Sequence, residues 1–126
     1  MLVDDFPPML DRAAEVLAAT CVVVGAVLDG SAALAAAATL KPDVIVLDIS
    51  LPDISGLDVA ARLPLVGSTA AVVFLTLHEE GALIEAATST GAFGYVVKQR
   101  LYEDLAAAVS EARAGRPFIS RIERAS

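Results

Sequence analysis

Five short runs of apolar residues, most of them β-branched, recur along the chain, and each is followed by a longer segment rich in alanine and leucine. The runs cover residues 2–3, 21–24, 44–47, 71–75 and 93–97. Nearly continuous apolar character over four or five residues is typical of strands that are covered on both faces of a parallel sheet. The alternation therefore predicts an α/β fold, a (βα)5 doubly wound parallel sheet of five strands with helices on both faces.

The segments between these runs carry helix start and stop signals. Pro7 and Pro8 can begin the first helix, because proline is tolerated in the first helical turn, and Ser31 can cap the second. Pro64 is expected to stop the third helix, and Gly115 follows the end of the fifth. The helices are therefore expected over residues 7–20, 32–40, 57–63, 80–90 and 101–114.

The length and charge of the chain limit what it can do alone. Its 126 residues fit one domain, and its net charge of −7 repels the phosphate backbone of nucleic acids. Every stretch without a charged residue is shorter than the roughly 18 residues that a membrane helix needs, and no basic signal-peptide segment is found at the start. The single cysteine, Cys21, cannot form an internal disulfide. We therefore expect a cytoplasmic domain that binds neither nucleic acid nor membrane.

Charged and hydroxyl side chains stand at the ends of four of the predicted strands. Asp4 and Asp5 follow the first, Asp48 follows the third, Thr76 follows the fourth and Lys98 follows the fifth. Each alone has a simpler explanation, such as a helix cap or a turn. Because the carboxyl ends of parallel strands meet at one edge of the sheet, we expect all five residues to lie close together there.

Such a cluster needs extra positive charge. Two carboxylates about 4 Å apart repel each other by roughly 4 kcal/mol at an effective dielectric near 20. Lys98 supplies one positive charge, and Mg²⁺, which prefers oxygen ligands, would supply more. A carboxylate beside a cation and a lysine is suited to phosphoryl transfer, in which an aspartate acts as the nucleophile.

Four segments, in this order along the chain, resemble receiver domains of two-component response regulators. They are Asp4-Asp5, the loop Asp-Ile-Ser-Leu-Pro-Asp-Ile-Ser-Gly from residue 48 to 56, Phe74-Leu75-Thr76 and Gly94-Tyr95-Val96-Val97-Lys98. The resemblance runs from Leu2 to about Ser120 and implies the receiver (flavodoxin-like) strand order 2-1-3-4-5. It also implies a receiver domain over residues 1–118, followed by a tail or linker over residues 119–126.

The resemblance assigns a role to each residue of the cluster. Asp48 would accept a phosphoryl group from a phosphohistidine of a sensor histidine kinase. Asp5 and Asp48 would bind Mg²⁺ directly, Asp4 would contribute through water, and the backbone carbonyl of Ser50 would be a further ligand.

The remaining roles concern the response to the phosphoryl group. Thr76 would donate a hydrogen bond to a phosphoryl oxygen, and Lys98 would pair with its charge. Tyr95 would be the aromatic switch, turning inward as Thr76 moves.

The segment Leu75-Thr76-Leu77-His78-Glu79-Glu80 and the ending Ala114-Gly115-Arg116-Pro117-Phe118-Ile119-Ser120 look like the LuxR/NarL type. Receivers of that type usually control dimerisation or a DNA-binding output domain, and thereby transcription. The resemblance therefore implies a signalling phosphoacceptor that can form a homodimer, rather than an enzyme that acts on a separate substrate.

Three other functions share parts of this pattern. A flavin binder of the same architecture would need a phosphate-binding loop rich in glycine, serine or threonine where this chain has Asp-Asp-Phe-Pro-Pro. A phosphohydrolase with an aspartyl nucleophile would normally carry it after the first strand and would need a substrate cap. A pseudo-receiver that only binds a partner stays open, because the first predicted strand is short and could leave the metal site incomplete.

Overall fold

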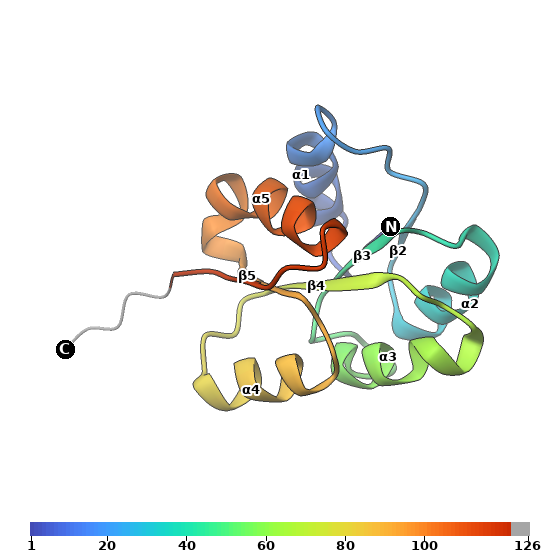
Figure 1. Cartoon of the computed structure of the whole chain (residues 1–126). Coiled ribbons are helices and arrows are strands. Elements are labelled where there is room, and N and C mark those ends of the chain that lie inside the picture. The colour runs from blue at the N-terminus through green and yellow to red at the C-terminus, as the bar shows by residue number, and fades with distance from the viewer. Residues whose placement is uncertain (122–126) are drawn as a thin grey trace.

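Helices and strands alternate along the chain in the computed structural model, which describes residues 1–121 (Figure 1). The helices are α1 (Pro7–Leu17), α2 (Gly30–Leu40), α3 (Gly56–Arg62), α4 (Gly81–Ser89) and α5 (Leu101–Arg113). The strands are β1 (Leu2–Val3), β2 (Ala26–Val27), β3 (Val44–Leu47), β4 (Ala71–Thr76), β5 (Gly94–Val97) and β6 (Phe118–Ile119). Two 3-10 turns, η1 (Leu63–Val66) and η2 (Lys98–Arg100), follow α3 and β5.

The strands form one parallel sheet in the order β2-β1-β3-β4-β5-β6. This order confirms the predicted 2-1-3-4-5 arrangement, and the short strand β6 extends it by one strand beside β5. Helices α1 and α5 cover one face, and α2, α3 and α4 cover the other (Figure 1). The chain therefore has the predicted doubly wound fold.

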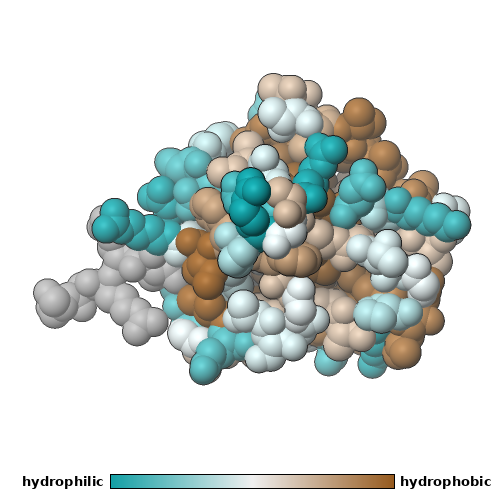
Figure 2. Space-filling model, viewed as in Figure 1, coloured by the Kyte–Doolittle hydropathy of each residue, from teal (hydrophilic) through white to brown (hydrophobic). Residues whose placement is uncertain are grey.

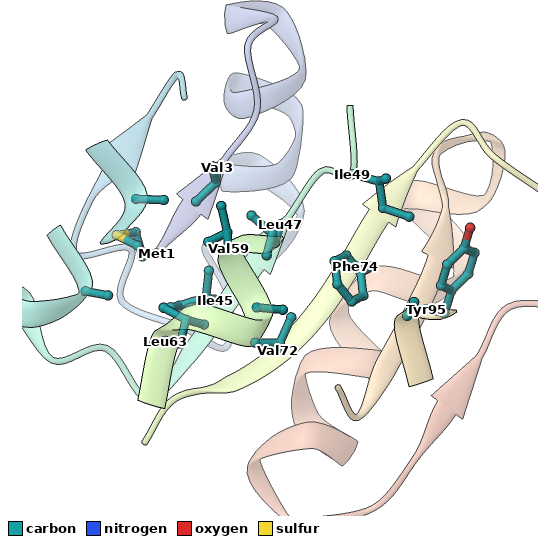
Figure 3. Close-up of a cluster of buried hydrophobic side chains, with 14 of the residues drawn as sticks. Met1, Val3, Ile45, Leu47, Ile49, Val59, Leu63, Val72, Phe74 and Tyr95 are labelled. Carbon is teal, nitrogen blue, oxygen red and sulfur yellow. The ribbon is translucent and has the colours of Figure 1, made fainter. Parts of the chain in front are cut away.

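The two cores of the protein come from the alternation of side chains along the central strands. In β3, Val44 and Val46 face α1 and α5, whereas Ile45 and Leu47 face the other three helices. Figure 3 shows this second core, in which Phe74 stands between the β3 side chains and Tyr95. Because both faces are buried, β3 is apolar at every position and β4 is apolar up to Thr76 at its end, and this is the pattern that made these strands predictable.

The predicted strand at residues 21–24 is wrong. Strand β2 instead covers Ala26–Val27, and the side chain of Val22 is 87% exposed. Strand β1 has two residues, which pair with Ala26 and Val27, so no strand lies opposite residues 22–24. Figure 2 shows apolar surface where the segment after α1 runs in Figure 1.

Helix boundaries differ from the predictions by a few residues. Helix α1 ends at Leu17, before the predicted end at residue 20. Helix α2 begins earlier than predicted, because Asp29 rather than Ser31 is its cap and accepts a hydrogen bond from the Ala32 amide at 2.7 Å. Pro64 lies inside η1, which continues from α3.

The packed fold extends beyond the predicted boundary at residue 118. Ile119 pairs with Tyr95 in the sheet, and the Ser120 amide donates to the Tyr95 carbonyl at 2.8 Å. The first two residues assigned to the tail are therefore part of the domain, and residues 122–126 of that tail lie outside the described residues.

Among the described helices, none is long and apolar enough to cross a membrane.

Candidate functional site

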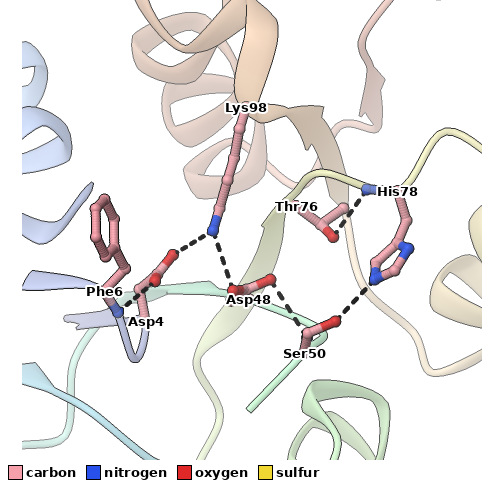
Figure 4. A network of polar contacts seen from close by, with 7 residues as sticks. All are labelled: Asp4, Phe6, Asp48, Ser50, Thr76, His78 and Lys98. Carbon is pink, nitrogen blue, oxygen red and sulfur yellow. Dashed lines mark hydrogen bonds and ion pairs between the residues drawn. The ribbon is translucent and has the colours of Figure 1, made fainter. Parts of the chain in front are cut away.

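Side chains from four neighbouring strands meet at the carboxyl edge of the sheet, as predicted. Asp4 follows β1, Asp48 follows β3, Thr76 ends β4 and Lys98 follows β5, and these strands are adjacent in the order of the sheet. Figure 4 shows the Lys98 side chain reaching between Asp4 and Asp48. Asp4, Asp48 and Thr76 are all buried.

Lys98 joins the two buried carboxylates. Its Nζ lies 2.7 Å from Asp4 Oδ2 and 3.1 Å from Asp48 Oδ2. Burial alone would lower the pKa of Lys98, but its ion pairs with Asp4 and Asp48 outweigh burial and raise the pKa. Burial raises the pKa of Asp48 despite the opposing effect of Lys98, and the neighbouring Asp4 carboxylate adds to the rise.

The acidic cluster has room for a further cation. Asp4, Asp5 and Asp48 carry carboxylate oxygens that lie within 4.8 Å of one another, and Asp5 is exposed. Asp4 Oδ1 accepts from the Phe6 amide at 2.9 Å, and the buried Oδ2 has the Lys98 ammonium as its partner at 2.7 Å. Buried carboxylate oxygens normally have such partners. A hard divalent cation such as Mg²⁺, which keeps several waters, fits this oxygen set and its open side.

The loop after Asp48 is held by backbone contacts. Asp48 Oδ1 accepts from the Ser50 amide at 3.3 Å, and the Gly56 amide donates to the Ile49 carbonyl at 2.7 Å. A Cβ atom at Gly56 would overlap the Asp48 carbonyl oxygen, so glycine is required for this close approach. The two ends of this loop, at Asp48 and Gly56, are therefore in direct contact beside the acidic cluster.

A second contact ties this loop to α2. The Asp53 carboxylate accepts from the Gly30 amide at 2.8 Å, the Ser31 amide at 2.9 Å and the Ser31 hydroxyl at 2.6 Å. These bonds, the Ser31 hydroxyl first, lower the pKa of Asp53. Ser31, predicted as the cap of α2, instead donates hydrogen bonds to the carboxylate of Asp53, which lies 22 positions further along the chain.

The loop after β4 closes the other side of the site. The His78 amide lies 3.3 Å from Thr76 Oγ1, and the His78 ring Nε2 lies 2.8 Å from Ser50 Oγ. The Tyr95 hydroxyl donates to the His78 carbonyl at 2.8 Å. Tyr95 is buried beside Phe74, with ring centroids 6.4 Å apart, and burial raises its pKa to about 12. Tyr95 therefore already lies inward and is linked to the Thr76 loop.

The structure brings together Asp4, Asp5, Asp48 and Lys98 as expected, and it places Thr76 at the end of β4 and Tyr95 within β5, where both contact His78. The contacts of Asp53 with α2 and of His78 with Ser50 were not predicted. Each joins residues more than twenty positions apart, 23 and 28 respectively. In the sequence, the only indication of these two contacts was that Asp53 and His78 are polar residues in the loops that follow Asp48 and Thr76.

Comparisons with known proteins place the chain among signalling proteins. A family model described as the response regulator receiver domain matches residues 1–110. The chain is 40% identical over 115 residues to the positive alginate biosynthesis regulatory protein of Pseudomonas aeruginosa, covering 89% of this chain and 46% of that protein. It is 29% identical over 122 residues to the nitrate/nitrite response regulator protein NarL of Escherichia coli, covering 95% and 56%.

Solved structures agree with these sequence relatives. The signal receiver domain of the putative response regulator NarL from Mycobacterium tuberculosis superimposes with a TM-score of 0.85 at 30% identity, covering 91% of this chain and 94% of that one. The chain spans about half the length of the curated relatives it matches.

Proposed function

This chain belongs to the family of response regulator receiver domains, of the LuxR/NarL type, and from that premise we propose that it accepts a phosphoryl group on Asp48 from a phosphohistidine of a sensor histidine kinase. The observation that carries the proposal is the Lys98 ammonium held between Asp4 and Asp48 at the ends of the central strands. A nucleophilic carboxylate beside a fixed positive charge is the arrangement that phosphoryl transfer requires.

In the proposed transfer, an Asp48 carboxylate oxygen bonds to phosphorus as the bond from phosphorus to the donor nitrogen breaks. The donor imidazole keeps the electron pair of that bond. Lys98 then pairs with the transferred group, and the Thr76 hydroxyl donates a hydrogen bond to one of its oxygens. Because Lys98 is already paired with Asp48, little reorganisation of this positive charge is needed as negative charge develops.

We propose Mg²⁺ as the cofactor of this step. Asp5 and Asp48 would hold it directly, Asp4 would contribute through water, and the Ser50 carbonyl would complete the protein ligands. The excess of three carboxylates over the one ammonium group of Lys98, and the exposed position of Asp5, support this assignment. When bound, Mg²⁺ supplies positive charge that neutralises the phosphoryl oxygens.

The transferred group adds a charge of about −1.5 to −2 at neutral pH. We propose that Thr76 and Tyr95 respond to this charge, because both contact His78. The His78 amide lies near the Thr76 hydroxyl, and the His78 carbonyl accepts a hydrogen bond from the Tyr95 hydroxyl. The result would be a new surface on α4 and β5 that favours a homodimer or controls an output domain, and through it transcription. We expect that the acidic chain does not bind DNA itself. We also expect the phosphoryl transfer to Asp48 to take place in the cytoplasm.

Intact mass spectrometry after incubation with acetyl phosphate and Mg²⁺ tests this proposal. The wild type should gain one phosphoryl group, and omission of Mg²⁺ or the Asp48→Asn substitution should abolish the gain. Asp58→Asn, which removes an exposed acid of α3, should leave it unchanged. A folded wild-type protein that gains no mass would contradict the proposal and favour a pseudo-receiver.

A further inference from the structure

The turn that carries Lys98 is fixed on both sides by residues outside the acidic cluster. Strand β5 ends at Val97, η2 contains Lys98 and Arg100, and α5 begins directly afterwards at Leu101. A lysine side chain is long and flexible, so the position of its ammonium depends on how firmly its backbone is held.

Ser120 holds the residue before Lys98. Its hydroxyl accepts from the Val97 amide at 3.2 Å and donates to Asp104 Oδ2 at 2.7 Å. Its own amide donates to the Tyr95 carbonyl at 2.8 Å, directly after the residues of β6. The residue is 3% exposed, so these bonds are shielded from water.

Asp104 holds the other end of the turn. This carboxylate of α5 is buried, and it accepts from Arg100 Nε at 2.8 Å and from Arg100 Nη2 at 3.2 Å. The hydrogen bonds from Arg100 lower its pKa and outweigh the effect of burial. Asp104 therefore stays ionised, and a two-pronged bond to an arginine fixes direction as well as distance.

Together these contacts form a closed ring around the turn. It runs from Val97 through Lys98 to Arg100, across to Asp104, on to Ser120 and back to the Val97 amide. We propose that Asp104 and Ser120 are positioning residues for Lys98, so that docking of the β6 segment and binding of a phosphoryl group at Asp48 favour each other. The proposal rests on the proposed function and adds the last described segment of the chain to its phosphoryl-binding site.

The physical reason for the coupling is that both events depend on one turn. A phosphoryl group that pairs with Lys98 restrains η2 and hence Val97, whose amide then stays aligned with Ser120. Loss of the Ser120 bonds frees the same turn and allows the ammonium to leave the acceptor. Coupling between two binding events is reciprocal, so each should strengthen the other by the same factor.

Beryllofluoride, a noncovalent mimic of the phosphoryl group, provides an equilibrium test on the whole chain with Mg²⁺ present. Ser120→Ala and Asp104→Asn should weaken its binding by about five- to tenfold. Ser120→Thr, which keeps the hydroxyl, should restore most of the affinity. Glu111→Gln is the matched control, because Glu111 is an acid on the same helix that pairs with Arg116 at the far end.

Hydrogen exchange of residues 117–121 supplies the reciprocal measurement. Saturating beryllofluoride should slow exchange there in the wild type by a factor similar to the affinity loss in Ser120→Ala, and it should not do so in that variant. A purely structural role would lower stability without this matched pair of effects.

The outcomes separate the two proposals. If the wild type gains a phosphoryl group but folded Ser120→Ala binds beryllofluoride as tightly as the wild type, the coupling is wrong and the phosphoacceptor proposal stands. If the wild type neither gains a phosphoryl group nor binds beryllofluoride, both proposals are overturned. Should Asp104→Asn fail to fold, the milder Ser120→Ala and its threonine partner decide the matter.

Discussion

The two ends of the sheet are built differently. At the carboxyl end, Lys98 binds two carboxylates, and the Asp48 loop closes on itself at Gly56. At the amino end, a groove of about 540 Å³ opens beside Met1, and the nearby Val22 is 87% exposed. At the carboxyl end, charged side chains are held by one another and by loop contacts, whereas at the amino end the backbone bonds of Met1 are made but the apolar side-chain packing is incomplete.

The difference shows where positional precision is concentrated in this chain. Strands β3, β4 and β5 have four, six and four residues, whereas β1 and β2 have two each. Asp48, Thr76 and Lys98 extend from the long strands, and Asp4 and Asp5 extend from a short one. Asp4 and Asp5, two of the proposed Mg²⁺ ligands, are therefore the part of the site with the weakest support from the sheet.

Adding a methyl group to one glycine at each end of the sheet should give the largest difference in the free energy of unfolding. In Gly56→Ala the new Cβ overlaps the Asp48 backbone, which cannot move without displacing the loop. In Gly25→Ala it meets Leu40 Cδ1 at 2.8 Å, the far end of a side chain that is 44% exposed and can rotate away. Urea denaturation should show a loss of about 3 kcal/mol or more for Gly56→Ala and less than about 1 kcal/mol for Gly25→Ala. Equal losses would break the comparison.

Mg²⁺ should stabilise the carboxyl end alone. At about 100 times its dissociation constant, a ligand bound only to the folded state adds roughly 2.7 kcal/mol to the free energy of unfolding. Asp5→Asn should remove most of this gain, and Asp43→Asn, an exposed acid at the amino end, should keep it. Thermal unfolding with and without Mg²⁺ measures both, and an undiminished gain in Asp5→Asn would rule out the assigned ligand.

Asp48→Asn should make the folded chain more stable at neutral pH, although it abolishes the acceptor. The pKa of Asp48 is raised in the folded state, so keeping it ionised opposes folding once the pH exceeds its ordinary value of 3.8. We therefore expect a gain at pH 7, whose size depends on how far burial raises the pKa of Asp48. The gain should disappear as the pH falls below 3.8, because the carboxyl group is then protonated in both states. Denaturation curves at the two pH values would show a constant difference if burial were not the cause.

Polar substitution at the amino end should have the smallest effect. Val22→Ser should change the free energy of unfolding by less than about 0.5 kcal/mol, because the side chain makes little contact with the core. A loss above about 1 kcal/mol in the same assay would mean that residues 22–24 are packed in solution, and the contrast between the two ends would be smaller.

Sequence reasoning succeeded where a single local rule determines the structure. Strand β3 was predicted with its observed bounds, because burial on both faces makes it apolar throughout. The meeting of Asp4, Asp48 and Lys98 followed from the rule that parallel strands end at one edge.

It failed where structure depends on a partner far along the chain. Residues 21–24 have strand composition but face no strand, because on that side of the sheet β1 pairs only with Ala26 and Val27. Asp104 lies in α5 and Ser120 directly follows β6, and no local pattern marks their shared bond. Residues joined across 16 positions by one hydrogen bond leave no periodic signal in a single sequence.

Tyr95 gives the chain its own optical reporter. The protein has no tryptophan and two tyrosines, of which Tyr102 is 68% exposed and Tyr95 is buried with its hydroxyl bonded to the His78 carbonyl. A Tyr102→Phe variant would leave one phenol to account for the tyrosine absorption and emission of the protein. Any movement of the loop after β4 would then change the ultraviolet spectrum directly, without an added label.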